Sequence, residues 1–205
     1  MSQKIAYVTG GMGGIGTAIC HRLHKMGYKV IAGCGPSRDF DKWLGEQKAM
    51  GYTFYASVGN VADWQSTTVA FTKAVELHGV IDVLVNNAGI TRDRMFLKMT
   101  RDDWDAVIDT NLNGTWWMMQ AAARRWRDRS VPGSIVNIVA NVWRGMPQVA
   151  HTCAARAGVI YLSKSIAIEW APLGIRVNCV SPGSIATEGL NLYPPGAAER
   201  FGDAN

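Results

Sequence analysis

The sequence lacks the features that would place it in a membrane or outside the cell. No apolar run approaches the roughly 18 residues that a bilayer-spanning helix needs. The first residues, MSQKIAYVTGG, enter a strand pattern at once and leave no room for a signal peptide. We therefore expect a cytoplasmic protein with no membrane partner.

Cysteine pairs and clusters of metal ligands are also missing. The four cysteines are scattered, without a CxxC pair, and His21 and His24 lie one helical turn apart with no third ligand near them in the sequence. These absences argue against a disulfide framework, and we expect no metal site.

Charge is scarce as well: charged residues make up 18% of the chain, against 48% hydrophobic residues, and the net charge is +5. This balance is typical of a globular α/β protein and argues against disorder. The basic run RRWRDR at 124–129 falls at a predicted helix end, where cations complement the helix dipole. We therefore expect no nucleic-acid partner.

What the sequence does contain is a regular alternation of strand-like and helix-like segments. Nearly continuous apolar runs predict strands at 4–10, 29–35, 53–58, 82–89, 134–140 and 175–183. Amphipathic patterns predict helices at about 14–26, 38–50, 63–78, 100–129 and 152–171. Such alternation predicts a single α/β domain over 1–205, a Rossmann-type doubly wound parallel sheet with strand order 3-2-1-4-5-6.

A glycine-rich stretch joins the first strand to the first helix. The run TGGMGGIG at 9–16 lets the backbone turn tightly and approach a pyrophosphate, while the helix N-terminus supplies amide donors and a positive dipole end. A glycine-rich turn alone is weak evidence, but its place between a strand and a helix favours a dinucleotide site.

Four motifs in order resemble the short-chain dehydrogenase/reductase family. They are TGxxxGIG at 9–16, NNAG at 86–89, NLNG at 111–114 and SPGSIAT at 181–187. Within the family, residues 1–112 resemble bacterial acetoacetyl-CoA reductases, and residues 113–205 are more similar to the branch of trans-2-enoyl-CoA reductases and citronellol-type dehydrogenases.

The resemblance implies which residues bind the cofactor. The glycine-rich turn would hold the diphosphate, Asn60 and Val61 would flank the adenine, 87–89 would line the ribose side, and 182–187 would position the nicotinamide. The expected cofactor-binding residues are Gly10, Gly13, Gly14, Ile15, Gly16, Gly35, Arg38, Asn60, Val61, Asn87, Ala88, Gly89, Pro182, Gly183, Ile185 and Thr187.

The end of the second strand predicts NADPH as the cofactor. An NAD site usually places a carboxylate there to bond the ribose 2′-hydroxyl. Here the strand ends AGCGPSR, with no acid before Asp39 and with Arg38 close by. A carboxylate would repel a 2′-phosphate, whereas an arginine can pair with it.

The proton donor that the family uses for carbonyl reduction is not at its usual place. The asparagine of the family pattern matches Asn111, but the serine position falls on Val139–Ala140, and the tyrosine and lysine positions fall on Thr152 and Arg156. In one alternative Arg156 binds the ribose, and Thr152 or a water gives the proton.

In the other alternative a tyrosine one turn before Lys164 serves, as in the enoyl-reductase-like branch. Ile160 occupies that place here, so Tyr161 lies about 100° around the helix from the expected position. Both Tyr161 and Lys164 stay candidates, and packing of Tyr161 within the helix is the competing interpretation.

Three functional hypotheses are open. The first is NADPH-dependent reduction of a 3-ketoacyl-CoA such as acetoacetyl-CoA, as in polyhydroxybutyrate synthesis, impaired by the altered catalytic motif. The alternatives are an enoyl-thioester or terpenoid-alcohol oxidoreductase, or a cofactor-binding protein with little catalysis. The acyl group could contact three residues of the loop after the fifth strand, Trp143, Met146 and Pro147. Arg144 could bind a phosphate of coenzyme A. Ordinary packing is the alternative explanation for Trp143.

The resemblance also implies a homo-oligomer. Trp116 and Trp117 lie on the helix that family members use for dimer contacts, so we expect core or interface burial for them. Family members usually continue with a further helix and strand, so we expect 175–183 to form an exposed apolar edge.

Overall fold

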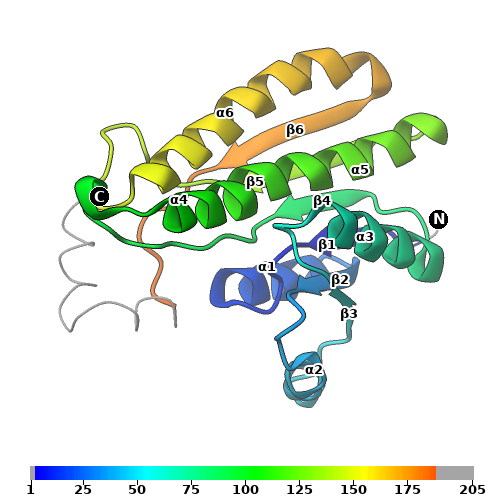
Figure 1. The fold of residues 1–205 in the computed structure, drawn as a ribbon. Coiled ribbons are helices and arrows are strands. Elements are labelled where there is room, and N and C mark those ends of the chain that lie inside the picture. Colours follow the sequence, from blue (N-terminus) through cyan, green and yellow to red (C-terminus); the bar gives the residue numbers. More distant parts are fainter. Residues whose placement is uncertain (1–2, 188–205) are drawn as a thin grey trace.

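The structure, a computed structural model, describes residues 3–187 as one α/β unit (Figure 1). Its sheet has six strands in the order β3-β2-β1-β4-β5-β6, all paired in parallel, which confirms the predicted topology. The strands are β1 (Ile5–Val8), β2 (Lys29–Cys34), β3 (Phe54–Val58), β4 (Val83–Asn86), β5 (Gly133–Ile138) and β6 (Ile175–Val180).

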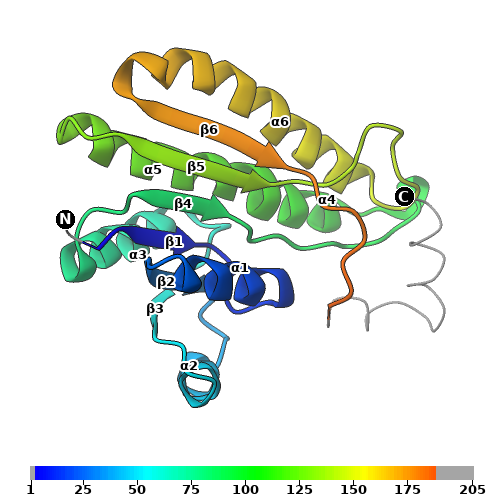
Figure 2. The same ribbon diagram turned by 180° about the vertical axis from the view of Figure 1, so that it is seen from behind.

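The helices alternate with these strands, as Figures 1 and 2 show from opposite sides. The α-helices are α1 (Gly14–Lys25), α2 (Phe40–Ala49), α3 (Trp64–His78), α4 (Arg101–Ile108), α5 (Gly114–Asp128) and α6 (Ala150–Trp170). Short 3-10 turns lie at Phe96–Lys98 and Ala171–Leu173. The basic run at 124–129 lies at the end of α5, as expected.

The sheet separates two apolar cores. On one face Tyr7, Leu84 and Ile135 pack with residues of α3, α5 and α6, among them the fully buried Trp126. On the other face Val8, Val30, Ala32 and Val85 pack under α1 and α2. Because the strands are parallel and covered by helices, their carboxyl ends meet at one edge of the sheet, where ligands bind in this architecture.

One predicted helix is interrupted. The segment expected as a single helix over 100–129 consists of α4, a π-helical turn η2 (Asp109–Asn113) and α5. Thr100 begins α4 with a capping box in which its side chain accepts from the Asp103 backbone, as the sequence pattern indicated. The π-helical turn has no counterpart in the hydrophobic periodicity, and it carries Asn111.

β6 forms one edge of the sheet in the described part of the chain. Ile175 and Val177 are buried, whereas Arg176, Asn178 and Val180 are exposed. The exposed side chains of this edge strand are therefore both polar and apolar, rather than wholly apolar as expected.

Candidate active site

The glycine-rich turn between β1 and α1 has no room for side chains. Gly10 has φ +59°, which favours glycine, and a Cβ there would lie 3.0 Å from the Ala88 Cα. A Cβ at Gly16 would collide with the Gly10 carbonyl oxygen and would lie 2.8 Å from the Gly11 Cα. Gly13 is the N-cap of α1 and has no side-chain cap, and Ile15 follows in the first turn. The turn therefore opens onto an uncapped helix N-terminus suited to a phosphate.

Thr9 holds this turn to the end of β4. Its Oγ1 accepts from the backbone N–H of Asn87 at 2.9 Å and of Ala88 at 3.0 Å. The Asn87 side chain in return donates to the Thr9 and Gly10 carbonyls, at 3.1 and 3.0 Å. Sequence reasoning missed Thr9, although it immediately precedes the first glycine of the motif.

The segment after β6 returns to the same turn. Figures 1 and 2 show this orange segment, which contains Pro182, Gly183 and Ile185, descending from β6 toward the glycine-rich end of α1. A Cβ placed on Gly14 would lie 2.7 Å from the Thr187 Cβ. Two predicted binding segments, 9–16 and 182–187, are thereby brought together.

Arg38 lies beside the glycine-rich turn at the end of β2. Its Nη2 donates to the Met12 carbonyl at 2.8 Å, and the residue is otherwise exposed. Gly35, directly after β2, is also exposed, and a Cβ there would meet nothing within 4 Å. The Arg38 guanidinium therefore lies next to the glycine-rich turn, at the carboxyl end of the strands.

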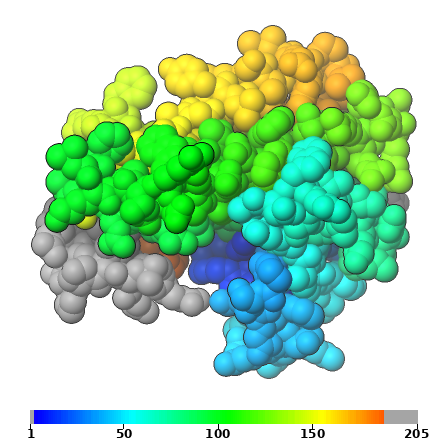
Figure 3. All heavy atoms as spheres, viewed as in Figure 1, coloured from blue at the N-terminus to red at the C-terminus, as the bar shows by residue number. Residues whose placement is uncertain are grey.

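A small hollow lies between the ends of β1 and β4 and the start of α5. It is lined by Thr9, Val61, Asn86, Ala88, Thr110, Gly114 and Thr115. Within the described residues the buried Asn86 Oδ1 has no hydrogen-bond partner and belongs to this lining. Asn60 turns the chain toward α3, because its Oδ1 accepts from Ala62 and its carbonyl from Thr67. Figure 3 shows dark-blue N-terminal atoms set back between the green helices and the blue segment around α2.

The π-helical turn fixes Asn111 against the chain that follows β4. Asn111 is 1% exposed, its Oδ1 accepts from the Ile90 N–H and its Nδ2 donates to the Ile90 carbonyl, both at 2.9 Å. The Asn111 carbonyl accepts from the Thr115 hydroxyl at 3.0 Å. Such π-turns inside helices occur frequently at functional sites.

Arg156 of α6 reaches the same place. It is 9% exposed, and a Cβ on Gly89 would collide with its Nη2 and lie 3.1 Å from the Asn111 Oδ1. Burial lowers the pKa of Arg156 to about 10, which still leaves the guanidinium charged at neutral pH. Among the described residues its buried Nη1 has no hydrogen-bond partner. A buried guanidinium N–H in this position can donate a hydrogen bond to an acceptor on a bound molecule.

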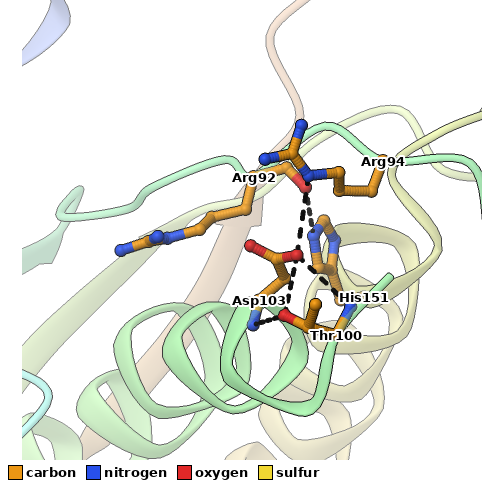
Figure 4. Close-up of polar contacts among 5 residues, drawn as sticks. All are labelled: Arg92, Arg94, Thr100, Asp103 and His151. Carbon is orange, nitrogen blue, oxygen red and sulfur yellow. Dashed lines mark hydrogen bonds and ion pairs between the residues drawn. The ribbon is translucent and has the colours of Figure 1, made fainter. Parts of the chain in front are cut away.

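Thr152 lies one turn before Arg156 on the same buried face of α6. Its hydroxyl lies 3.4 Å from Nδ1 of the fully buried His151, which also accepts from the Thr152 N–H at 2.8 Å. The His151 Nε2 contacts the Arg92 carbonyl at 2.9 Å (Figure 4). Sequence reasoning missed His151, because a lone histidine carries no spacing signal.

Tyr161 and Lys164 lie elsewhere on α6. Tyr161 is 66% exposed, and the Lys164 Nζ lies 4.6 Å from its ring centroid. Tyr161 stands on the helix face opposite Thr152, so the structure does not bring it to Asn111 and Gly89. Tyr161 therefore lies on the exposed surface of the helix, where it contacts Lys164.

The position of the family's serine carries no hydroxyl. Val139 is 5% exposed and donates its N–H to the Val180 carbonyl, and Ala140 follows it. In the next loop Trp143 is 90% exposed, so it lies outside the core of the described residues, and Met146 is 37% exposed. Arg144 and Pro147 are exposed as well.

These residues fit a dinucleotide. The glycine turn excludes side chains, and Arg38 supplies a cation beside it. Asn86 and Arg156 each bury a polar atom that has no partner among residues 3–187. In the described part of the chain no helix is long and apolar enough to cross a bilayer. No group of three potential metal ligands occurs there either.

Comparison with known proteins agrees with this geometry. Residues 4–194 match the family described as short chain dehydrogenase. The acetoacetyl-CoA reductase of Cupriavidus necator is 54% identical over 190 residues, 92% of this chain and 77% of that protein. Nodulation protein G of Azospirillum brasilense is 45% identical over 190 residues, with the same shares. A 3-oxoacyl-(acyl-carrier-protein) reductase of Staphylococcus aureus is 42% identical over 188 residues, 90% of this chain and 76% of that protein. The likeness to acetoacetyl-CoA reductases thus extends beyond residue 112.

Proposed function

The chain belongs to the short chain dehydrogenase family of NAD(P)-dependent oxidoreductases, and we propose that it reduces 3-ketoacyl-CoA thioesters, with acetoacetyl-CoA as the model substrate. The observation that carries the proposal is the meeting of Gly89, Asn111 and the buried Arg156 next to the glycine-rich turn. The relatives named as acetoacetyl-CoA and 3-oxoacyl-(acyl-carrier-protein) reductases support the choice of a 3-ketoacyl thioester.

The cofactor in this proposal is NADPH. When bound it supplies the hydride that reaches the carbonyl carbon. The glycine-rich turn and the N-terminus of α1 bind its diphosphate, and Arg38 pairs with the 2′-phosphate. Residues 87–89 and 182–187 line the remainder of the site, with Asn60 and Val61 toward the adenine.

Arg156 takes the role that a lysine has in the family pattern. Its Nη1, which has no hydrogen-bond partner in the described part of the chain, binds a ribose hydroxyl. The charge of Arg156 is retained because its lowered pKa of about 10 stays well above neutrality. A guanidinium is a weaker proton source than an ammonium group, so Arg156 orients the ligand but does not tune a donor. Asn111 holds the 89–90 backbone that borders this contact.

Thr152 stands nearest to the place of the missing tyrosine and supplies the proton. An aliphatic hydroxyl is a much poorer acid than a phenol, and Val139 and Ala140 offer no second hydroxyl for the developing oxyanion. Loss of a positioned general acid costs about 10²–10⁴ in rate. We therefore propose slow ketone reduction rather than none.

The lack of a tyrosine phenol and of a serine hydroxyl at their family positions favours a second candidate function, reduction of an enoyl thioester. Hydride addition to a conjugated carbon needs a clamp on the thioester oxygen, and water can deliver the last proton. A site with Val139 and Ala140 in place of the serine tolerates that reaction better than ketone reduction.

Two assays test the proposal together. NADPH binding is measured by titration of the purified chain, and NADPH consumption is then followed with acetoacetyl-CoA and, separately, with crotonyl-CoA. Faster consumption with acetoacetyl-CoA supports the first function, and faster consumption with crotonyl-CoA the second. Binding without consumption leaves a cofactor-binding protein.

A further inference from the structure

The start of α2 carries both a cation and an acid next to the glycine-rich turn. Arg38, the residue proposed to bind the 2′-phosphate, lies just before Asp39, the N-cap of this helix. The Asp39 carboxylate accepts from the Lys42 N–H at 3.0 Å, so the helix engages the acid. The Arg38 guanidinium donates to the Met12 carbonyl at 2.8 Å. The position of the first turn of α2 therefore bears directly on where the Arg38 cation lies.

Trp43 joins this first turn to α1. Its N–H donates to the Asp39 carbonyl at 3.4 Å, and its ring stacks on Phe54 with the centroids 5.4 Å apart. Trp43 is 5% exposed, and its indole N–H, which can only donate, is directed to the Thr17 hydroxyl at 3.3 Å. A second contact with α1, made by Gln47, lies one turn further from Arg38.

The Thr17 hydroxyl continues this contact to the glycine-rich turn. Because the hydroxyl accepts from Trp43, its own proton can be donated to the Gly11 carbonyl, 3.4 Å away. The Cys20 thiol also donates to that carbonyl, at 3.6 Å. Burial raises the pKa of Cys20 to about 12, so the thiol keeps its proton at neutral pH. The peptide that carries the Met12 carbonyl follows directly, so its direction depends on how the Gly11 carbonyl is held.

We propose that Trp43 is a positioning residue for cofactor choice: through its contact with Thr17 it holds the start of α2, and with it Arg38, beside the glycine-rich turn. The inference rests on the proposed binding of NADPH and on the role proposed for Arg38. Trp43 itself touches no part of the cofactor in this proposal, and it acts only through the place of the Arg38 guanidinium.

The diphosphate side of the turn is held by other contacts. The Gly11 N–H donates to the Gly33 carbonyl at 2.9 Å, which continues the pairing of β1 with β2. The Thr9 hydroxyl oxygen accepts from the Asn87 N–H, also at 2.9 Å. These bonds remain when the indole N–H is removed. Loss of the contact between Trp43 and α1 should therefore weaken NADPH binding more than NADH binding.

The competing explanation is that Trp43 only fills the core beneath α2, where it packs with Phe54. Replacement of such a residue lowers the stability of the protein and weakens binding of both cofactors alike, or of neither. Trp126 offers a matched control. It is 1% exposed in the core on the opposite face of the sheet, and its indole N–H also donates to a backbone carbonyl, that of Ile81.

The first experiment measures Kd for NADPH and for NADH by calorimetric titration at a fixed ionic strength. Trp43→Phe removes the indole N–H and keeps an aromatic ring, and Thr17→Val removes the hydroxyl at nearly constant shape. The contacts are long for hydrogen bonds, so we expect each variant to bind NADPH about fivefold more weakly, with Kd for NADH changed by less than about twofold. Thr17→Ser keeps the hydroxyl and should bind both cofactors as the unmodified chain does. Trp126→Phe should change neither Kd.

The second experiment needs no cofactor. In the ¹H,¹⁵N spectrum of the cofactor-free protein, the indole signal of Trp43 is assigned by its loss in Trp43→Phe. We expect this signal to shift in Thr17→Val and to keep its position in Thr17→Ser. An unchanged indole signal in Thr17→Val would overturn the proposal, because Trp43 would then make no hydrogen bond to α1.

The outcomes separate this inference from the proposed cofactor. If the unmodified chain prefers NADPH and Trp43→Phe and Thr17→Val keep the full preference, the positioning role is wrong while NADPH binding stands. The same holds if Trp126→Phe reduces the preference equally. If the unmodified chain binds neither cofactor, or binds both equally, the cofactor proposal fails and the positioning role falls with it. If Trp43→Phe does not fold, Thr17→Val decides.

Discussion

Replacing Arg38 with aspartate should remove the preference for NADPH. In the unmodified chain its Nη2 donates to the Met12 carbonyl at 2.8 Å, so the guanidinium stands at the side of the glycine-rich turn. A charge-assisted hydrogen bond contributes about 1.5–3 kcal/mol. Exposure and salt reduce this to about 1.4 kcal/mol, or tenfold in Kd. We therefore expect NADPH to bind the unmodified chain at least tenfold tighter than NADH.

In Arg38→Asp the carboxylate repels a 2′-phosphate but can accept a hydrogen bond from a ribose 2′-hydroxyl. NADPH affinity should therefore fall at least tenfold, and NADH affinity should stay equal or rise. Both Kd values are measured by calorimetric titration at one fixed ionic strength, because the effect is screened by salt. Arg129→Asp, with the same charge change just beyond α5, should leave both values unchanged. Equal affinity of the unmodified chain for the two cofactors would refute the role given to Arg38.

Three further changes test other parts of the site. Gly16→Ala places a Cβ against the Gly10 carbonyl oxygen, so the affinity for NADPH should fall at least tenfold. The circular dichroism spectrum should stay that of an α/β protein. An unchanged Kd for NADPH would contradict the close packing of the glycine-rich turn. The triple variant Ala140→Ser, Thr152→Tyr and Arg156→Lys restores the serine, tyrosine and lysine of the family pattern. Its kcat for acetoacetyl-CoA should rise by about 10² or more. If the variant folds and kcat does not rise, these three residues do not limit the rate. Tyr161→Phe should change kcat by less than about twofold, since the Tyr161 side chain is 66% exposed. A larger loss of kcat would show that Tyr161 takes part in catalysis.

Sequence periodicity was sufficient for the topology, because parallel strands buried on both faces read as continuous apolar runs. It was insufficient for the helix over 100–129. There the π-helical turn carries Asn111, whose side chain makes two hydrogen bonds to the Ile90 backbone. This contact joins residues far apart in the sequence, so no local pattern predicts it.

The candidate site, too, could be predicted from the sequence only in part. The contact of Thr187 with Gly14 and the position of Arg38 beside the glycine turn follow from motifs whose places in the architecture are regular. Our proposal of Thr152 rather than Tyr161 as the proton donor does not follow from spacing, since each lies about one turn from a basic residue on the same helix. It required the burial of each side chain, which depends on how α6 packs on the sheet.

The most direct measurement is steady-state NADPH oxidation by the purified chain with saturating acetoacetyl-CoA. A typical enzyme turns over at about 10 s⁻¹, and loss of the usual proton donor costs about 10²–10⁴. We predict acetoacetyl-CoA-dependent oxidation of NADPH at about 10⁻³–10⁻¹ s⁻¹, with 3-hydroxybutyryl-CoA as the product. A rate near 10 s⁻¹ would contradict the active site described for Thr152 and Arg156, and no oxidation above the substrate-free rate would contradict ketone reduction itself.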